Sequence, residues 1–268
     1  MPRHQLTLTL IQMNVTLGQP EKNLQRLQRL LQASNDKPDI VLLPELWSTG
    51  YDYQHLNTLA ASTPALIANL AQLATARNFY IGGSLLEKDG DRLYNTFYLL
   101  APTGHQVAAY RKIHLFSLMD EDLYINPGNQ PCLIQVYDHP VGLLTCYDIR
   151  FPELSRALAL AGAELLLVCA QWPKPRTAHW RTLLRARALE NQLFVAGCNR
   201  IGQDRKLSFP GASAIYDPWG NCVLRPPRRQ GAFTTTINLN KITTVRHNLD
   251  CFKDRRPEAY DLKPRVSR

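Results

Sequence analysis

Three side chains that could carry out covalent chemistry each come directly after a predicted β-strand. Glu45 follows the apolar run Ile-Val-Leu-Leu-Pro, Lys112 follows Ala-Ala-Tyr-Arg, and Cys146 follows Val-Gly-Leu-Leu-Thr. In open α/β sheets, ligands bind at the carboxyl ends of the strands. Together the three groups could cleave a carbonyl–nitrogen bond: the thiol attacks, the carboxylate passes its proton to the leaving amine, and the ammonium stabilises the oxyanion. The backbone N–H of Tyr147 would be a second oxyanion donor.

Each of the three residues also has a simpler interpretation when it is taken alone. Cys146 could be a buried structural thiol, because free cysteine is among the most buried residue types. Glu45 could cap a helix, and Lys112 could protect the exposed edge of a sheet. A carboxylate directly after an apolar run is costly to desolvate, so Glu45 needs a cation, a hydrogen-bond donor or a proton beside it.

The segment that follows Cys146 predicts a sharp turn and the beginning of a helix. Pro152 suits the first turn of a helix, and Glu153 suits the positive end of the helix dipole. A helix N-terminus beside a thiol lowers the thiol pKa and makes it more nucleophilic. We therefore expect Cys146, among the six cysteines, to be the one that is alkylated rapidly near neutral pH.

Apolar periodicity predicts strands and helices that alternate along the chain. Strands are expected at residues 6–13, 40–43, 79–85, 93–100, 106–112, 133–137, 141–145, 165–170, 193–199, 212–216, 223–225 and 232–239. Helices are expected at residues 20–34, 64–77, 154–161 and 178–191. Alternation combined with many antiparallel pairs favours an α/β fold of two mixed β-sheets with helices outside. We expect one domain over residues 1–268, with an extended tail from about residue 249.

Composition limits the partners that this chain is expected to have. The fractions of hydrophobic residues, 45%, and of charged residues, 20%, are those of an ordinary globular protein. A net charge of +9 and a pI of about 9.4 would suit nucleic acid or a small anion. The basic residues are not interleaved with aromatic residues as in a base-stacking surface, so we expect a small anionic partner and no nucleic acid.

The cysteines and the N-terminus predict a soluble cytoplasmic protein. The six cysteines form no Cys-x-x-Cys pair, and several lie in apolar runs, as in proteins of a reducing compartment. The alternating run at residues 6–10 is too short and too polar for a signal peptide or a membrane span. No membrane partner is expected.

Three segments resemble the signature segments of the nitrilase superfamily, the carbon–nitrogen hydrolases. They are Leu-Pro-Glu at 43–45, Tyr-Arg-Lys-Ile-His-Leu-Phe at 110–116 and Cys-Tyr-Asp-Ile-Arg-Phe-Pro-Glu at 146–153, and the resemblance extends over residues 6–260. It implies a four-layer αββα sandwich, no metal and no organic cofactor. It also implies a catalytic triad of Glu45, Lys112 and Cys146. Many members use a second glutamate shortly after the lysine, for which Glu121 is the nearest candidate, with Asp120 adjacent.

Within the superfamily the chain is similar to the omega-amidases, which hydrolyse the side-chain amides of 2-oxoglutaramate and 2-oxosuccinamate. The similarity rests on segments within residues 120–129, 171–180, 187–192 and 254–258. The last of these resembles a tail that crosses to a partner subunit in the family, which implies a homodimer.

A small anionic amide would need a cation for its distal carboxylate and apolar walls for its chain. Arg176 or Lys174, in the proline-rich loop after residues 165–170, is the expected cation, although either could be a solvated loop charge. Trp172 and Phe116 are expected to form walls of the pocket, unless they belong only to the core. Two further residues receive structural roles: Arg150 as a partner of Glu153 or of a core carboxylate, and His114 as a hydrogen-bonded histidine.

The sequence therefore predicts a thiol amidohydrolase that releases ammonia through a cysteine thioester. Its most favoured substrate is an omega-amide of a short dicarboxylic acid, such as 2-oxoglutaramate. The same three groups would also suit an N-carbamoyl amine, deaminated glutathione or a nitrile. A different class of function, a non-catalytic basic binding protein on the same scaffold, is the remaining alternative.

Overall fold

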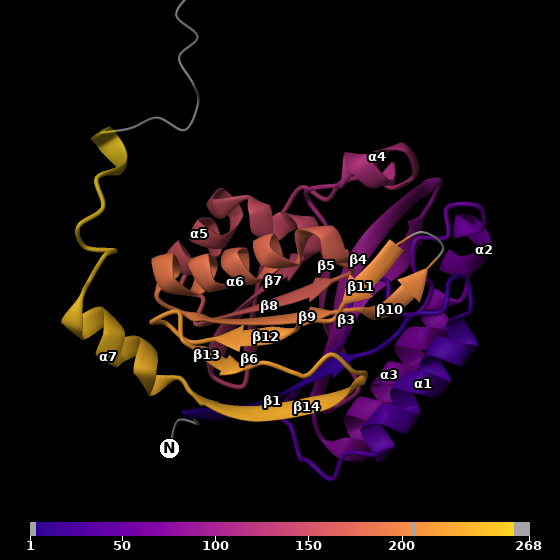
Figure 1. Cartoon of the computed structure of the whole chain (residues 1–268), viewed down its shortest axis with the longest axis horizontal. Coiled ribbons are helices and arrows are strands. Elements are labelled where there is room, and N and C mark those ends of the chain that lie inside the picture. Colours follow the sequence, from indigo (N-terminus) through magenta and orange to yellow (C-terminus); the bar gives the residue numbers. More distant parts are fainter. Residues whose placement is uncertain (1–3, 205–206, 260–268) are drawn as a thin grey trace, which may run out of the picture.

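Two β-sheets pack face to face, and helices cover their outer faces (Figure 1). The computed structural model describes residues 4–204 and 207–259. Each of the two large sheets has six strands, and each mixes parallel and antiparallel pairs. The layers run helix, sheet, sheet, helix, so the predicted αββα sandwich is confirmed.

The first sheet contains the strands that carry Glu45 and Lys112 at their ends. Its spatial order is β14 (Gly231–Asn238), β1 (Gln5–Gln12), β2 (Ile40–Leu42), β3 (Tyr80–Asp89), β4 (Arg92–Leu100) and β5 (Gln106–Arg111). The central pairs β1–β2 and β2–β3 are parallel, and the outer pairs are antiparallel. Its helices are α1 (Pro20–Gln32), α2 (Leu56–Ala60) and α3 (Thr63–Arg77).

The second sheet contains the strand that leads to Cys146. Its spatial order is β13 (Cys222–Leu224), β12 (Ala214–Tyr216), β9 (Phe194–Asn199), β8 (Leu165–Ala170), β7 (His139–Thr145) and β6 (Cys132–Val136). The pairs β7–β8 and β8–β9 are parallel. Helices α5 (Pro152–Leu160) and α6 (Thr177–Asn191) cover its outer face (Figure 1).

Alternation along each strand divides the apolar side chains between an inner and an outer core. Leu8 of β1 and Leu167 of β8 belong to the cluster between the two sheets. Ile11 packs with α1 and α3, whereas Leu166 packs with α5 and α6. Successive side chains of a strand point to opposite faces, so strands buried on both faces are continuous apolar runs. This explains why periodicity located these strands.

Some elements differ from the sequence-based prediction. Strand β3 runs on to Asp89, beyond the predicted end at residue 85, because it pairs with β4 along its whole length. Not predicted were α2, α4 (Glu121–Tyr124), the hairpin of β10 (Ile201–Asp204) and β11 (Leu207–Pro210), α7 (Asn240–Asn248), and the 3-10 turns η1 (Ser117–Met119), η2 (Cys146–Arg150), η3 (Lys174–Arg176) and η4 (Pro257–Ala259). These pieces are too short, or too polar, for a clear apolar period.

The segment after α7 leads away from the two sheets (Figure 1). It begins where the extended tail was expected and contains η4. The predicted tail also includes residues 260–268, which lie outside the described residues. Within the described part of the chain, no helix is both long enough and apolar enough to cross a bilayer.

Candidate active site

Glu45, Lys112 and Glu121 meet in one buried cluster at the carboxyl ends of the strands. The Lys112 Nζ atom lies 2.8 Å from Glu45 Oε1 and 2.7 Å from Glu121 Oε2. All three side chains are fully buried. The Cys146 thiol forms a hydrogen bond with the Glu45 carboxylate, which places sulfur, carboxylate and ammonium in one contact group.

Glu45 is held by the close approach of two neighbouring strands. A Cβ atom on Gly83 of β3 would lie only 2.6 Å from Leu43 Cβ and 3.0 Å from the Pro44 carbonyl oxygen, so this position requires glycine. The N–H of Leu46 donates to Ser84 Oγ at 2.8 Å. Leu46 itself has a φ of +38°, which is strained for a leucine. The chain therefore turns sharply just after Glu45.

A glycine also fixes the backbone at Lys112, which directly follows β5. The N–H of Gly128 donates to the Lys112 carbonyl oxygen at 2.7 Å, and the Lys112 N–H donates to the Asn95 carbonyl oxygen at 2.8 Å. A Cβ atom on Gly128 would lie 2.1 Å from the Arg111 carbonyl oxygen, which no side chain tolerates. Backbone contacts on both sides thus aim the lysine into the protein.

Cys146 occupies a strained turn between β7 and η2. Its φ is +45°, in the left-handed region that side chains rarely adopt. The turn is stabilised by a capping box, in which Thr145 and Asp148 exchange hydrogen bonds between side chain and backbone. Cys146 as a whole residue is 9% exposed, and it lines the adjoining pocket.

Asp148 ties this turn to the residues around Lys112. Its Oδ1 atom accepts the N–H of His114 at 3.0 Å and lies 2.8 Å from His114 Nδ1. The His114 ring is stacked on Phe151. The hydrogen bond predicted for His114 is therefore present.

Two hydrogen-bond donors of the carboxylate cluster were missed from the sequence. The Tyr51 hydroxyl donates to Glu45 Oε1 at 2.6 Å and to Glu121 Oε1 at 3.2 Å. Asn95 Nδ2 donates to the same two oxygens at 2.9 Å and 3.1 Å. A buried asparagine inside the apolar strand β4 was a usable signal, because buried polar groups need partners. Tyr51 lies in an irregular loop and gave none.

Burial and neighbouring opposite charges shift the pKa values of Glu45 and Lys112 in opposite directions. Burial raises the pKa of Glu45, but the Lys112 ammonium and the hydrogen bonds from Lys112, Tyr51 and Gln171 outweigh it and lower that pKa below its ordinary value. Burial lowers the pKa of Lys112, but Glu121 and Glu45 hold it well above its ordinary value. At neutral pH the site therefore contains a carboxylate and an ammonium.

The pKa of the Cys146 thiol is shifted in the direction opposite to the one predicted from the sequence. Burial and the Glu45 carboxylate raise the pKa of Cys146 well above its ordinary value, against the smaller opposite effect of Lys112. The expected lowering by a helix N-terminus is wrong for this site, because an adjacent carboxylate and desolvation both disfavour a thiolate. The resting cysteine is thus a neutral S–H that needs a base.

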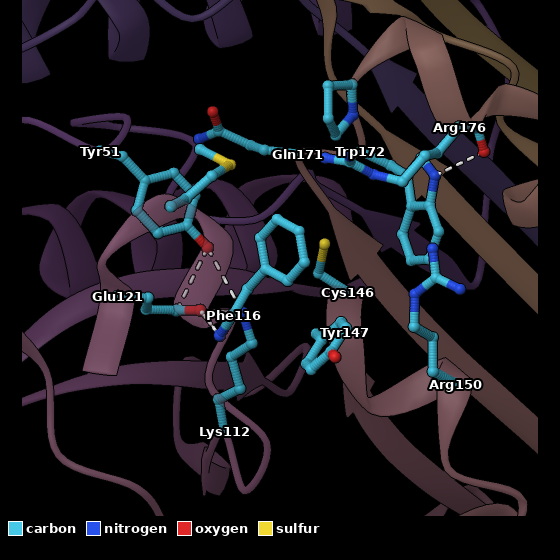
Figure 2. A pocket seen from close by; sticks show the side chains of 12 residues that line it. Tyr51, Lys112, Phe116, Glu121, Cys146, Tyr147, Arg150, Gln171, Trp172 and Arg176 are labelled. Atoms are coloured by element: carbon cyan, nitrogen blue, oxygen red, sulfur yellow. Dashed lines mark hydrogen bonds and ion pairs between the residues drawn. The ribbon is translucent and has the colours of Figure 1, made fainter. Parts of the chain in front are cut away.

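A pocket opens over this cluster. Figure 2 shows the Cys146 thiol facing the space between Phe116 and Trp172. The lining residues are Tyr51, Lys112, Phe116, Met119, Glu121, Cys146, Tyr147, Arg150, Gln171, Trp172, Pro173 and Arg176. The structure thus brings together every predicted site residue of this pocket except Lys174, which is exposed outside it, and Glu45, which lies behind the lining.

Two guanidinium groups lie on the aromatic walls. Arg150 stands 4.7 Å from the ring centre of Trp172, and Arg176 stands 5.2 Å from that of Phe116. The structural role predicted for Arg150 differs from this placement: its nitrogen lies 3.3 Å from His179 Nδ1, and no ion pair joins it to a carboxylate of the described residues. The 3-10 turn η2 directs this side chain to the pocket.

Across the described residues, no group of three or more His, Cys, Asp or Glu side chains is arranged to hold a metal ion. The pocket lining offers cations and aromatic rings, which suit an organic anion.

Known proteins resemble this chain along most of its length. Residues 7–247 match the family model described as carbon-nitrogen hydrolase. The 2-oxoglutaramate amidase of Bacillus subtilis (strain 168) is 36% identical over 256 residues, which cover 95% of this chain and 99% of the amidase. The crystal structure of XC1258 from Xanthomonas campestris, a CN-hydrolase superfamily protein with an arsenic adduct in the active site, gives a TM-score of 0.90 at 28% identity, with 95% of this chain and 98% of that chain covered.

A second solved structure shows a covalent adduct. It is a glutamate-to-glutamine mutant of the amidase from Nesterenkonia sp. AN1, with the acetamide moiety of fluoroacetamide added at the active-site cysteine. It gives a TM-score of 0.84 at 27% identity and covers 96% of this chain and 97% of that chain.

The fold and these similarities define the class of protein as a hydrolase that acts on carbon–nitrogen bonds other than peptide bonds. The chain belongs to the carbon-nitrogen hydrolase family and is an amidase of the nitrilase superfamily. The resemblance drawn from the three signature segments is confirmed.

Proposed function

We propose that the protein hydrolyses the omega-amide of a short dicarboxylic acid, such as 2-oxoglutaramate, through a thioester on Cys146. The observation that carries the proposal is the contact of the Cys146 thiol with Glu45, whose carboxylate is itself held by Lys112. A neutral thiol against an ionised carboxylate is the arrangement that general-base activation of a nucleophile requires.

In the first half of the reaction, Glu45 takes the thiol proton while the sulfur attacks the amide carbonyl carbon. The developing oxyanion accepts hydrogen bonds from the Lys112 ammonium and from the backbone N–H of Tyr147. The tetrahedral intermediate collapses, its C–N bond breaks, and Glu45 returns the proton to the leaving nitrogen. Ammonia and a thioester on Cys146 are the products of this half.

In the second half, a water molecule replaces ammonia. Glu45 takes a proton from this water as the oxygen attacks the thioester carbonyl carbon. Collapse of the second intermediate breaks the C–S bond, and the thiolate recovers its proton from Glu45. The acid leaves, and the net reaction consumes one water per amide.

Glu121 keeps the ammonium in position throughout both halves. Both of its carboxylate oxygens contact Lys112 Nζ, and Oε2 also accepts the Phe116 N–H at 2.8 Å. A second carboxylate also favours the charged lysine over transfer of its proton to Glu45. We therefore assign Glu121 a role in orienting Lys112, and no proton transfer.

The substrate class follows from the charges and walls of the pocket. Arg150 and Arg176 place two cations at the aromatic walls, where the distal carboxylate of an omega-amide would be bound. Trp172 and Phe116 would contact the short carbon chain between the two ends. The 36% identity to an amidase named for 2-oxoglutaramate supports the same substrate.

Ammonia release from a panel of compounds tests the proposal. The panel contains 2-oxoglutaramate, 2-oxosuccinamate, glutamine, an N-carbamoyl amino acid, deaminated glutathione and a simple nitrile. The wild type is compared with Cys146→Ala and Glu45→Gln, and with Cys222→Ala as a matched control for an exposed thiol outside the pocket.

We expect rapid release from the two oxo-amides. Loss of the general base should lower kcat/KM by about 10²- to 10⁴-fold, and loss of the nucleophile should abolish turnover. The control should retain wild-type activity. Ammonia release only from another member of the panel would assign a different substrate to the enzyme. Wild-type activity in Cys146→Ala would show that Cys146 is not the nucleophile.

We also propose that the protein is a cytoplasmic homodimer. All six cysteines are free thiols, which supports a reducing compartment. Leu160 at the end of α5, Leu189 on α6 and Leu249 after α7 are large apolar side chains exposed by about half. Light scattering should give twice the chain mass, and Leu189→Lys should lower it. A monomer at micromolar concentration would contradict the proposal.

A further inference from the structure

The loop that follows β8 holds the proposed base through one residue, Gln171. Its backbone N–H donates to Glu45 Oε2 at 2.9 Å. Its side-chain Nε2 donates to the Glu45 carbonyl oxygen at 2.7 Å and to the Leu46 carbonyl oxygen at 3.3 Å. Gln171 thus contacts both the carboxylate and the strained backbone turn beside it.

A buried arginine fixes the orientation of that amide. Arg200 is 1% exposed, and its Nη1 atom donates to Gln171 Oε1 at 2.8 Å. Its Nη2 atom donates to the Val15 carbonyl oxygen at 2.6 Å, and its guanidinium lies 4.2 Å from the ring centre of Phe209. Asp204 Oδ2 lies 3.6 Å from Arg200 Nη1, and the Arg26 cation also acts on the guanidinium.

The direction of these bonds matters, because arginine can only donate. With Arg200 in place, the Gln171 oxygen must face the guanidinium and the NH₂ group must face the carbonyl oxygens of Glu45 and Leu46. Without Arg200, rotating the Gln171 amide by half a turn would break no hydrogen bond on the side that now faces the guanidinium. The rotated oxygen would then repel the carbonyl oxygens, and the loop would have to move.

Asn199, the residue before Arg200, forms hydrogen bonds with Trp172, the residue after Gln171 in the loop that follows β8. Asn199 Oδ1 accepts the Trp172 N–H at 2.7 Å, and Asn199 Nδ2 donates to the Trp172 carbonyl oxygen at 3.1 Å. Two consecutive residues at the end of β9, Asn199 and Arg200, therefore form hydrogen bonds with two neighbouring residues of the loop, Trp172 and Gln171. Arg200 acts on Gln171, which contacts the base, whereas Asn199 acts on Trp172, which forms the pocket wall.

We infer that Arg200 is a positioning residue for the general base, acting on Glu45 through the oriented amide of Gln171. The inference rests on the proposed role of Glu45. It assigns to Arg200 an effect on the chemical step and to Asn199 an effect on substrate binding. Burial lowers the pKa of Arg200 to about 10, so the guanidinium remains a cation across the neutral range.

The test compares Arg200→Gln, Arg200→Lys and Asn199→Ala with the wild type. Arg77→Gln is the matched control, because Arg77 also donates to a backbone carbonyl, that of Leu31, but lies outside the site. Steady-state kinetics of ammonia release give kcat and KM, and the pH dependence of kcat/KM gives the acidic limb that reports ionisation of the base.

We expect Arg200→Gln to lower kcat by about 10- to 100-fold, part of the 10²- to 10⁴-fold supplied by a general base, with a smaller change in KM. The acidic limb should move to higher pH, since a displaced N–H donor stabilises the carboxylate less well. Asn199→Ala should raise mainly KM. Arg200→Lys keeps the positive charge but has a single donor nitrogen in place of the guanidinium fork. Its kcat should therefore lie between those of Arg200→Gln and the wild type.

The outcome that overturns the inference is a folded Arg200→Gln with the wild-type acidic limb and with kcat within about twofold of the wild type. If Arg200→Gln does not fold, an unchanged limb and kcat in Arg200→Lys would overturn it as well. Equal losses in Arg77→Gln would also overturn it, by showing a general effect of removing an arginine that donates to a backbone carbonyl oxygen.

A second measurement separates this inference from the proposed function. The pH dependence of Cys146 alkylation by iodoacetamide reports proton transfer to Glu45 without any turnover. If Glu45→Gln leaves that profile unchanged, the proposed function fails. If Glu45→Gln changes the profile and no Arg200 variant does, only the positioning role fails.

Discussion

The hydroxyl of Tyr110 donates a 2.7 Å hydrogen bond to Oδ2 of Asp148, and this bond joins the two sheets beside the pocket. Tyr110 lies on β5, two residues before Lys112, and Asp148 lies two residues after Cys146. Burial and the Asp148 carboxylate raise the pKa of Tyr110 well above its ordinary value, so the phenol stays a donor. The contact therefore helps to set the separation of the lysine and the cysteine.

Removing the acceptor should destabilise the protein more than removing one donor. Asp148 accepts bonds from Tyr110, from His114 and from the Thr145 N–H. Asp148→Asn turns one oxygen into a donor that faces other donors, and we expect the free energy of unfolding to fall by about 3–5 kcal/mol. Tyr110→Phe loses one bond and should cost about 1–3 kcal/mol.

Urea denaturation followed by circular dichroism measures both values, provided that each variant unfolds in a single transition. Thr236→Val, which removes a hydroxyl paired with Thr7 at the exposed edge of the first sheet, is the control and should change little. Equal losses for Asp148→Asn and Thr236→Val would contradict the importance given to the carboxylate.

The reactivity of the cysteines gives a second prediction. Cys222 and Cys251 are exposed, so general alkylating reagents will reach them as well as the pocket. Cys132 is partly buried and is removed with them. In a Cys132→Ala/Cys222→Ser/Cys251→Ser background, iodoacetamide should abolish activity in step with modification of Cys146 alone. Cys169 and Cys198 are fully buried and should remain unmodified in the native protein.

Peptide mass spectrometry over a time course, with activity measured in parallel, checks this order of labelling. The triple variant should retain wild-type activity, because all three thiols lie outside the pocket lining. Activity that disappears before Cys146 is modified would show that another group is the target.

The strand-end residues could be found from sequence because apolar periodicity locates buried strands well. Glu45 and Lys112 follow strands of the first sheet and Cys146 follows a strand of the second, and the face-to-face packing of the two sheets brings these strand ends together. Which cation reaches the pocket could not be found in this way. Arg150 lines the pocket and Lys174 does not, and that difference is set by backbone angles in the short turns η2 and η3.

The donors around the carboxylates show the same limit. Asn95 lies in a strand that was predicted and pairs with Leu86 of β3, yet only the packing of the fold places its amide against Glu45. Tyr51 comes from a loop whose path depends on the turn at Leu46. Contacts made across the fold by irregular segments have no period along the sequence, so they require the coordinates.

The cation on the Phe116 wall should decide selectivity for charged substrates. Arg176→Gln is expected to raise KM for an anionic omega-amide by about 10- to 100-fold, the value of about 1.5–3 kcal/mol for a charge-assisted hydrogen bond. Activity on a neutral amide such as propionamide should change little. Lys174→Gln is the matched control, since this lysine is two residues away and exposed outside the pocket.

Initial rates on both substrates across a range of ionic strength measure the effect. Added salt should weaken the preference of the wild type for the anion and leave that of Arg176→Gln almost unchanged. If Lys174→Gln weakens the preference for the anionic substrate more than Arg176→Gln does, then Lys174 and not Arg176 binds the substrate carboxylate.

The ionised carboxylate at Glu45 should make stability depend on pH in a defined acidic window. The pKa of Glu45 is held below its ordinary value of 4.5 by Lys112, despite burial. The unfolded chain then binds more protons than the folded one below that value, so the contribution of Glu45 is fully present above pH 4.5 and is lost as the pH falls.

Glu45→Gln isolates this contribution, because glutamine keeps the shape and cannot titrate. The difference in unfolding free energy between wild type and Glu45→Gln should be constant from about pH 6 to pH 8 and should decrease as the pH is lowered below the ordinary value of 4.5. Urea titrations at closely spaced pH values measure it. The pKa of Lys112 is raised, so its own contribution is lost only at alkaline pH and does not interfere. A difference that grows on acidification would mean that Glu45 is protonated in the folded protein, and a protonated Glu45 could not accept the proton of Cys146.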